Sequence, residues 1–258
     1  MPPSSSSAAD LYFLGGHDLE MQEIAGVLRE HSTAFVDHQL HWSQATYAAY
    51  AAEIVTALRA GRRPVLIELR EIPDSIRPLV DIIDHHGEDS GHLPTSLEQV
   101  LQRLGGTPTR EQQLIAANDK GYTEGMIAAG ATPEEVRRIR RADRAAQGIT
   151  PEQEQQAAAA IAARDTSVPG LTIVQLPNGR TATVTDLLNA HLGGPGYANL
   201  LILCPDEVNF YGVGKIISRL SQQFGGYEGG QLPVSGYWGL ETSDVEQRKA
   251  IRDFVESI

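Results

Sequence analysis

An acidic residue and two histidines follow one apolar segment. Asp84, His85 and His86 come directly after residues 79–83. A carboxylate and two neutral imidazoles suit Mn, Zn or Fe better than Ca. Successive side chains of a strand point to opposite faces, so at most one histidine shares a side with Asp84 unless the chain turns, as Gly87 permits. Alone, the triplet predicts either a metal site or a capped strand end with one core and one surface histidine.

Other polar residues also follow predicted strands. Apolar segments at 11–14, 34–37, 64–69 and 80–83 alternate with stretches of helical spacing, which predicts parallel strands joined by right-handed crossovers. Ligands of such sheets collect at the carboxyl ends of the strands. The polar residues at these ends are His17, Asp18, Glu20, Asp37, Glu68 and Asp84.

The middle of the chain is helical by its pattern. An amphipathic helix is predicted over 97–104, after Pro94-Thr95-Ser96, and a second over 110–117, which places Asp119 at its end. Two further helices begin at Thr-Pro caps, at residues 132–133 and 150–151. We expect these two to link two domains.

From residue 168 the pattern becomes β-like, with strands predicted over 171–176, 180–184, 199–203 and 208–211. Lys215 stands near a predicted helix start, where it could hold an anion. A glycine-rich loop then offers backbone that could approach a ligand closely, although a tight turn is the competing interpretation. Its glycines are Gly225, Gly226, Gly229 and Gly230.

Composition narrows the classes of partner. The 258 residues carry 21 Lys and Arg against 33 Asp and Glu, a net charge of −12 that disfavours long nucleic acid but not a small anion. Cys204 is the single cysteine, so a disulfide framework and a thiolate zinc site are excluded. Residues 1–10 have neither a basic region nor an apolar core, so we expect a disordered tail, no membrane segment and a cytoplasmic protein. A homodimer stays open.

Taken in order, the motifs resemble those of the DHH phosphoesterase superfamily, which includes RecJ-like exonucleases, oligoribonucleases, cyclic-dinucleotide phosphodiesterases and family II pyrophosphatases. Asp84-His85-His86 is similar to the motif that names the family, and His17-Asp18-Leu19-Glu20 to its first motif. Glu68 and Asp119 stand where the second and fourth motifs have Asp. The resemblance runs from about Leu11 to the C-terminus.

The chain also departs from the family pattern. Glu20 and Glu68 replace Asp, Met21 stands where many members have Gly, and the glycine-rich segment lacks the histidine of the usual GGGH motif. These departures keep two alternatives open. One is a metalloenzyme acting on a non-phosphate small molecule, and the other is a non-catalytic ligand-binding protein.

The resemblance implies an α/β fold in three parts after the tail: a Rossmann-like parallel-sheet domain over 11–130, a helical linker over 131–167, and a smaller α+β domain over 168–258 that clamps a small-molecule substrate. It implies one or two divalent ions, Mn first and Mg, Zn or Fe next, with a metal-bound hydroxide attacking phosphorus. Its ligands would be His17, Asp18, Glu20, Glu68, Asp84, His85 and Asp119. Catalytic roles fall to His86, Asp84 and Lys215, and substrate contacts to His92 and the four glycines.

Two polar clusters favour ordinary structural roles. The arginines between residues 137 and 144 share a predicted helix with acids, which favours a solvated, ion-paired face over a phosphate grip. Residues 37–42, which include His38, His41 and Trp42, could form a wall beside the first motif. A surface loop that carries histidines is the favoured interpretation.

Overall fold

The computed structural model describes residues 9–86 and 92–258, so Gly87 lies outside the described part of the chain. The chain divides into two compact units, residues 1–147 and 148–258. The fold is α/β, with a four-stranded parallel sheet in the first unit and a five-stranded mixed sheet in the second. This agrees with the predicted class.

The first sheet has the order β2-β1-β3-β4 and is parallel throughout. Its strands are β1 (Asp10–Leu14), β2 (Phe35–Asp37), β3 (Arg63–Ile67) and β4 (Asp81–Ile83). Since parallel neighbours run in register, all four carboxyl ends meet at one edge. The strands therefore bring the segments that follow them together.

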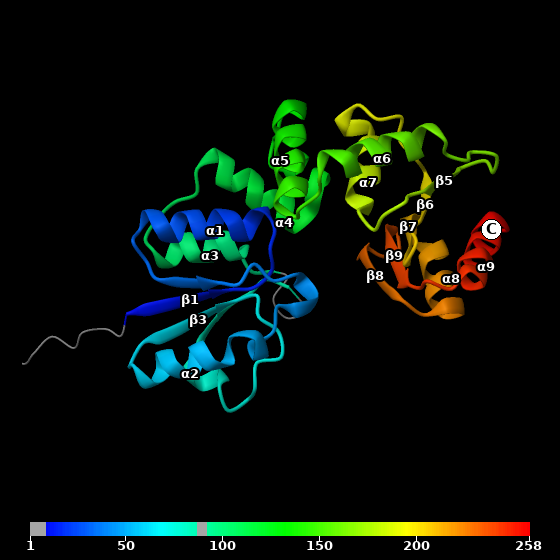
Figure 1. The fold of residues 1–258 in the computed structure, drawn as a ribbon. Helices are drawn as coiled ribbons and strands as arrows, with labels where there is room; N and C mark the ends of the chain where they lie inside the picture. The colour runs from blue at the N-terminus through cyan, green and yellow to red at the C-terminus, as the bar shows by residue number, and fades with distance from the viewer. Residues whose placement is uncertain (1–8, 87–91) are drawn as a thin grey trace, which may run out of the picture. The chain divides into compact units, whose positions relative to one another are not determined.

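Helices cover both faces of this sheet, as the apolar character of its strands requires. In Figure 1, α1 and α3 lie over one face and α2 over the other. Phe13 and Leu66 pack with Ile54 and Ala57 on the α2 side. The helices of this unit are α1 (Leu19–Glu30), α2 (Ala51–Arg59), α3 (Ser96–Arg103), α4 (Arg110–Ala128) and α5 (Pro133–Ala146).

The stretch with helical spacing before β3 is not one helix. It forms two short 3-10 helices, η1 (Trp42–Gln44) and η2 (Tyr47–Tyr50), before α2 begins; a third, η3 (Arg77–Leu79), precedes β4. Between η1 and η2 the backbone pairs with Arg70, whose N–H donates to the Ala45 carbonyl at 3.0 Å and whose carbonyl accepts from Tyr47 N–H at 2.8 Å. This pairing replaces the intrahelical hydrogen bonds and interrupts the helix.

α4 runs past its predicted end but breaks there. Gly121 and Tyr122 leave the helical region, and Tyr122 has a φ of +49°. The Asn118–Gly121 segment thus ends the first part of α4, with Asp119 in its last turn, and the helix resumes on the far side.

The second unit has a sheet of order β5-β6-β7-β9-β8, in which only β5 and β6 are parallel. Alternate side chains of β5 and β6 enter different cores: Ile173 and Leu201 pack with α8 and α9, while Val174 and Ile202 pack with α6 and α7. Its strands are β5 (Leu171–Gln175), β6 (Asn199–Leu203), β7 (Glu207–Val213), β8 (Tyr227–Gln231) and β9 (Ser235–Glu241). Its helices are α6 (Pro151–Ala162), α7 (Thr181–Leu188), η4 (Ala190–Leu192), α8 (Gly214–Phe224) and α9 (Val245–Glu256).

The strand predicted over residues 180–184 is wrong, because this segment forms α7. A parallel pair such as β5 and β6 needs a crossover connection, usually a helix. Val184 and Leu188, one helical turn apart, are fully buried against the sheet face formed by Val174 and Ile202. The tertiary need for a crossover outweighs the β preference of Thr and Val.

The two helices predicted as a linker belong to different units. α5 packs on α4 and α1, and α6 packs on α7 and β5. In the part of the chain that the structure describes, no helix has both the length and the apolar character needed to cross a membrane.

Candidate metal centre

Four side chains from different segments converge at the carboxyl edge of the first sheet. Nε2 of His85 lies 2.8 Å from Oδ2 of Asp119, 3.3 Å from Oε1 of Glu68 and 3.9 Å from Oε2 of Glu20. Glu20 comes from the start of α1, Glu68 follows β3, His85 follows β4 and Asp119 lies in α4. We call Glu20, Glu68, His85 and Asp119 the His85 cluster.

The backbone around Glu68 is unusual. Glu68 has a φ of +51°, a left-handed conformation that generally costs a non-glycine residue about 1–3 kcal/mol and occurs often at functional sites. A Cβ on Gly15 would lie only 2.7 Å from the carbonyl oxygen of Glu68, so the end of β1 can approach this closely only at glycine. The close approach holds Glu68 at the sheet edge.

The N-terminus of α3 supports both glutamates. Ser96 Oγ donates to Oε1 of Glu68 at 2.6 Å, and the backbone N–H of Leu97 donates to Oε1 of Glu20 at 2.9 Å. Thr95 caps this helix in a capping box with Glu98. The N-terminal end of a helix carries partial positive charge, which favours two nearby carboxylates.

Polar atoms of the His85 cluster remain unsatisfied. Four buried atoms have no hydrogen-bond partner among the described residues: Glu20 Oε2, Glu68 Oε2, His85 Nε2 and Asp119 Oδ2. The contacts of His85 Nε2 with the carboxylates are short but do not have hydrogen-bond geometry. Ligand atoms about 2.1 Å from one cation lie about 3–4 Å from each other. Glu20, His85 and Asp119 each offer a ligand atom within 4.8 Å of the other two, so these three side chains fit one divalent ion. Glu68 adds a further carboxylate 3.3 Å from His85 Nε2, and carboxylates with an imidazole are donors that suit Mn or Zn.

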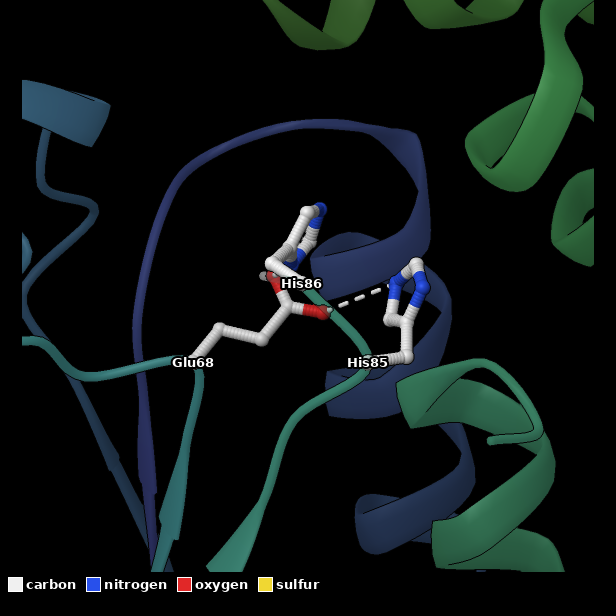
Figure 2. A group of neighbouring side chains, drawn as sticks. All are labelled: Glu68, His85 and His86. Atoms are coloured by element: carbon white, nitrogen blue, oxygen red, sulfur yellow. Dashed lines mark ion pairs between the residues drawn. The ribbon is translucent and has the colours of Figure 1, made fainter. Parts of the chain in front are cut away.

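Both histidines of the triplet lie on the same side of the chain. β4 ends at Ile83, and after it the rings of His85 and His86 approach to 4.2 Å between centroids. Figure 2 shows the Glu68 carboxylate between the two imidazoles. Nδ1 of His86 lies 3.7 Å from Glu68 Oε2, so Glu68, His85 and His86 form a second group with ligand spacing. The two imidazoles therefore do not alternate between faces as successive side chains of a strand do, and the turn that Gly87 permits lies outside the described residues.

Burial and mutual repulsion distort the acid-base properties of the cluster. Burial, followed by the charges of Asp119 and Glu68, raises the pKa of Glu20 well above its usual value. Burial alone would lower the pKa of His85, but the carboxylates of Asp119 and Glu68 outweigh it and raise this pKa to about 10. A divalent cation would relieve this concentration of negative charge.

Three predicted ligands lie outside the two groups. Asp18 caps α1, with Oδ1 accepting from the N–H of Met21 at 2.9 Å, and burial raises its pKa to about 7. His17 is half-buried, with Nε2 3.4 Å from Nε2 of Gln22. Asp84 instead accepts from the backbone N–H of His86 at 2.8 Å and lies 3.2 Å from its Nδ1. Asp84 therefore orients His86.

The remaining predicted site residues belong to other segments. His92 is exposed in the turn before α3. Lys215 is exposed in the first turn of α8, in the second unit. The glycine-rich segment is only partly a loop, because Gly229 and Gly230 belong to edge strand β8 while Gly225 ends α8 and Gly226 follows it. The catalytic role of Lys215 and the substrate contacts of His92 and the four glycines stay predictions.

Several residues near the site were not predicted from the sequence. The sequence placed Ser96 only at the start of a helix and gave no sign of its hydrogen bond to Glu68. Arg140 and Arg144 are buried rather than solvated, and Arg140 Nη1 donates to Asn118 Oδ1 and Asp143 Oδ2, each at 2.9 Å. The solvated-face interpretation is therefore wrong for these two arginines. Asn118 precedes Asp119, so Arg140 supports the turn of α4 that carries a cluster carboxylate.

Comparison with known proteins finds similarity to solved structures only. No protein-family model and no curated protein matches the sequence. A pGpG-specific phosphodiesterase, PggH from Vibrio cholerae, matches with 11% identity and a TM-score of 0.44 over 96% of this chain and 98% of its own. RecJ from Thermus thermophilus in complex with Mn²⁺ matches with 13% identity and a TM-score of 0.47 over 96% of this chain, which covers only 51% of the RecJ chain. Both similarities are at low sequence identity.

Proposed function

We propose that the protein is a metal-dependent phosphoesterase that hydrolyses a small phosphorylated compound. The observation that carries this proposal is the convergence of four buried, unsatisfied polar atoms of Glu20, Glu68, His85 and Asp119. Burial and mutual repulsion make these carboxylates costly, as the raised pKa of Glu20 indicates. A bound cation explains why this arrangement is stable.

These residues have distinct tasks in such an enzyme. Glu20, Glu68, His85 and Asp119 would hold the ion, which supplies Lewis acidity toward a phosphoryl oxygen and acidifies a water molecule. Ser96 and the N–H of Leu97 fix the orientation of the two glutamates. Held in this way, the carboxylates need no rearrangement when substrate arrives.

His86 is the group suited to proton transfer. Its side chain is 55% exposed, whereas that of His85 is 5% exposed, so His86 lies where the cluster opens to solvent. Asp84 orients the His86 ring through Nδ1. His86 can therefore hold a proton at the leaving oxygen while Asp84 maintains the direction of the ring.

The negative net charge of the protein favours a small substrate over a long polyanion. A net charge of −12 opposes a long polyanion but leaves a local cation free to attract one phosphoryl group. Manganese as the native ion, a cytoplasmic location and clamping by the second unit remain predictions.

Metal reconstitution followed by a substrate panel tests the proposal. Protein stripped with chelator and reloaded with Mn²⁺ is expected to hydrolyse at least one of pyrophosphate, dinucleotides and short oligonucleotides. His85→Gln should abolish turnover. The matched control is Asp74→Asn in the exposed β3–β4 connection, which should retain turnover. Absence of hydrolysis across the panel by protein that has bound metal would overturn the proposal.

A further inference from the structure

The indole of Trp42 lies beside the candidate metal centre. Its ring centroid is 6.1 Å from that of His86, with the two planes at 59°. His86 Nδ1 is in turn 3.7 Å from Glu68 Oε2. A single imidazole therefore separates the indole from a carboxylate of the His85 cluster.

Trp42 also packs directly on the first motif. A Cβ built on Gly16 would lie 2.2 Å from Cε2 of the indole. Any side chain at position 16 would displace the ring. Glycine there lets the indole pack against the backbone just before His17 and Asp18. The ring thus lies between the first motif and the Asp84-His85-His86 segment.

The backbone that carries Trp42 is anchored. Nη2 of Arg70 donates to the carbonyl oxygens of Trp42 and Ser43 at 2.9 and 2.8 Å. Leu40 and Tyr47, on either side of η1, pack with Trp42 on the core under α2. A ring held in this way loses little freedom when a ligand covers it.

Trp42 is nevertheless only half-buried. The other tryptophan of the chain, Trp238, is 0% exposed and donates through Nε1 to the Gly225 carbonyl at 2.7 Å. Trp42 is therefore the tryptophan that a ligand can reach.

We propose that Trp42 is a stacking platform that selects phosphorylated compounds bearing a planar ring, of which nucleotides are the chemical type. The inference rests on the proposed function in one respect, because the phosphate is taken to bind at the His85 cluster. The planar ring lies on the indole, and the sugar spans the width of His86. Stacking of a base on an aromatic side chain strengthens binding by about 10-fold to 100-fold and tolerates any base.

Tryptophan fluorescence measures this contact without any turnover. AMP titrated into Mn²⁺-loaded protein is expected to quench part of the emission in a saturable way, whereas ribose 5-phosphate is not. In Trp42→Leu the remaining emission comes from buried Trp238 and should not respond to AMP. A 5′-phosphorylated dinucleotide and a long single strand, titrated in parallel, distinguish free nucleotides from nucleic-acid ends.

Calorimetry on matched variants separates stacking from packing. Trp42→Leu should weaken AMP binding about tenfold and leave ribose 5-phosphate unchanged, and Trp42→Phe should cause a smaller loss. Tyr47→Leu is the control, since Tyr47 packs on the same core and has no ring contact with His86 in the described part of the chain. Its binding of AMP should match that of the wild type.

Each outcome decides the inference. Equal affinity of the wild type for AMP and ribose 5-phosphate would overturn it, and this comparison needs no variant to fold. Binding of AMP without a Trp42-dependent change in emission would overturn it as well. Quenching that depends on Trp42 in a protein that hydrolyses no phosphoester would support the platform while the proposed function fails. Hydrolysis of pyrophosphate without any preference for a ring would sustain the function and overturn the platform.

Discussion

Oδ2 of Asp119 lies 2.8 Å from Nε2 of His85, although Asp119 sits in α4 and His85 follows β4. The contact lacks hydrogen-bond geometry, so neither atom is satisfied by the other. Two buried, unsatisfied polar atoms at this distance are the arrangement expected of two ligands of one ion.

Replacing Glu20 with glutamine should have opposite effects with and without metal. In chelator, Glu20→Gln is expected to stabilise the fold by about 1–2 kcal/mol, because it removes a buried charge that Asp119 and Glu68 repel. With Mn²⁺ at about 100 times its Kd, the wild type should gain about 2.7 kcal/mol and the variant less. Thermal unfolding under both conditions measures this.

The exposed carboxylate of Asp74 is the control, and Asp74→Asn should change neither measurement. A Glu20→Gln protein that is less stable than the wild type in chelator, and gains equally from Mn²⁺, would show that Glu20 is only a structural residue.

Removing the Ser96 hydroxyl should weaken metal binding. Ser96 is fully buried and donates to Oε1 of Glu68, so Ser96→Ala frees a carboxylate that must be held in place. Losses of about 10-fold to 100-fold are typical when a partner of a metal ligand is removed. Calorimetric titration with Mn²⁺ tests the effect, with exposed Ser75→Ala as the control; unchanged affinity in Ser96→Ala would contradict it.

The buried pair of Arg140 and Asp143 should show strong coupling. Their side chains are 4% and 6% exposed, so Arg140→Leu leaves a buried charge on Asp143 and an unsatisfied Asn118. A loss of about 3–5 kcal/mol is expected in urea unfolding, with most of it regained in the double variant Arg140→Leu/Asp143→Leu. Additive effects of the two substitutions would refute this coupling.

Asp81 should contribute to stability at neutral pH but not in strong acid. Hydrogen bonds from Arg63 and Arg103 lower its pKa to about 2, against an ordinary value of 3.8. Because the folded pKa is depressed, the stabilisation is full above about pH 4 and is lost as the pH falls toward 2. With allowance for the exposure of Arg63, Asp81→Asn should cost about 1–2 kcal/mol at pH 7.

Urea unfolding at pH 7, and again in strong acid, measures this difference. The gap between the wild type and Asp81→Asn should narrow on acidification, and a gap that is constant with pH would contradict the assignment. Metal affinity should be unchanged, since Asp81 begins β4 and so lies at the edge opposite the His85 cluster.

Local sequence determined the strands and most helices of the first unit. Apolar segments alternating with helical spacing specify a parallel sheet, and such a sheet brings Glu68 and His85 to one edge. Thr-based caps at Thr95, Thr109, Thr132 and Thr150 mark four helix starts through neighbouring hydrogen bonds. The prediction of a strand over residues 180–184 was wrong, because the β preference of this segment is weaker than the requirement for a crossover helix between β5 and β6.

The residues of the candidate site likewise divide into those that the sequence indicated and those that only the tertiary structure placed. The sequence made Glu20, Glu68, His85 and Asp119 candidates, together with His17, Asp18 and Asp84, through their places at the ends of elements and through the resemblance to the DHH motifs. Only the tertiary structure decided that Asp18 caps a helix, that Asp84 orients His86, and that Ser96 and Trp42 lie beside the cluster. The physical reason is that ligand geometry depends on distances of a few ångströms between segments far apart in the chain, and these are set by packing of the whole unit and not by any local pattern.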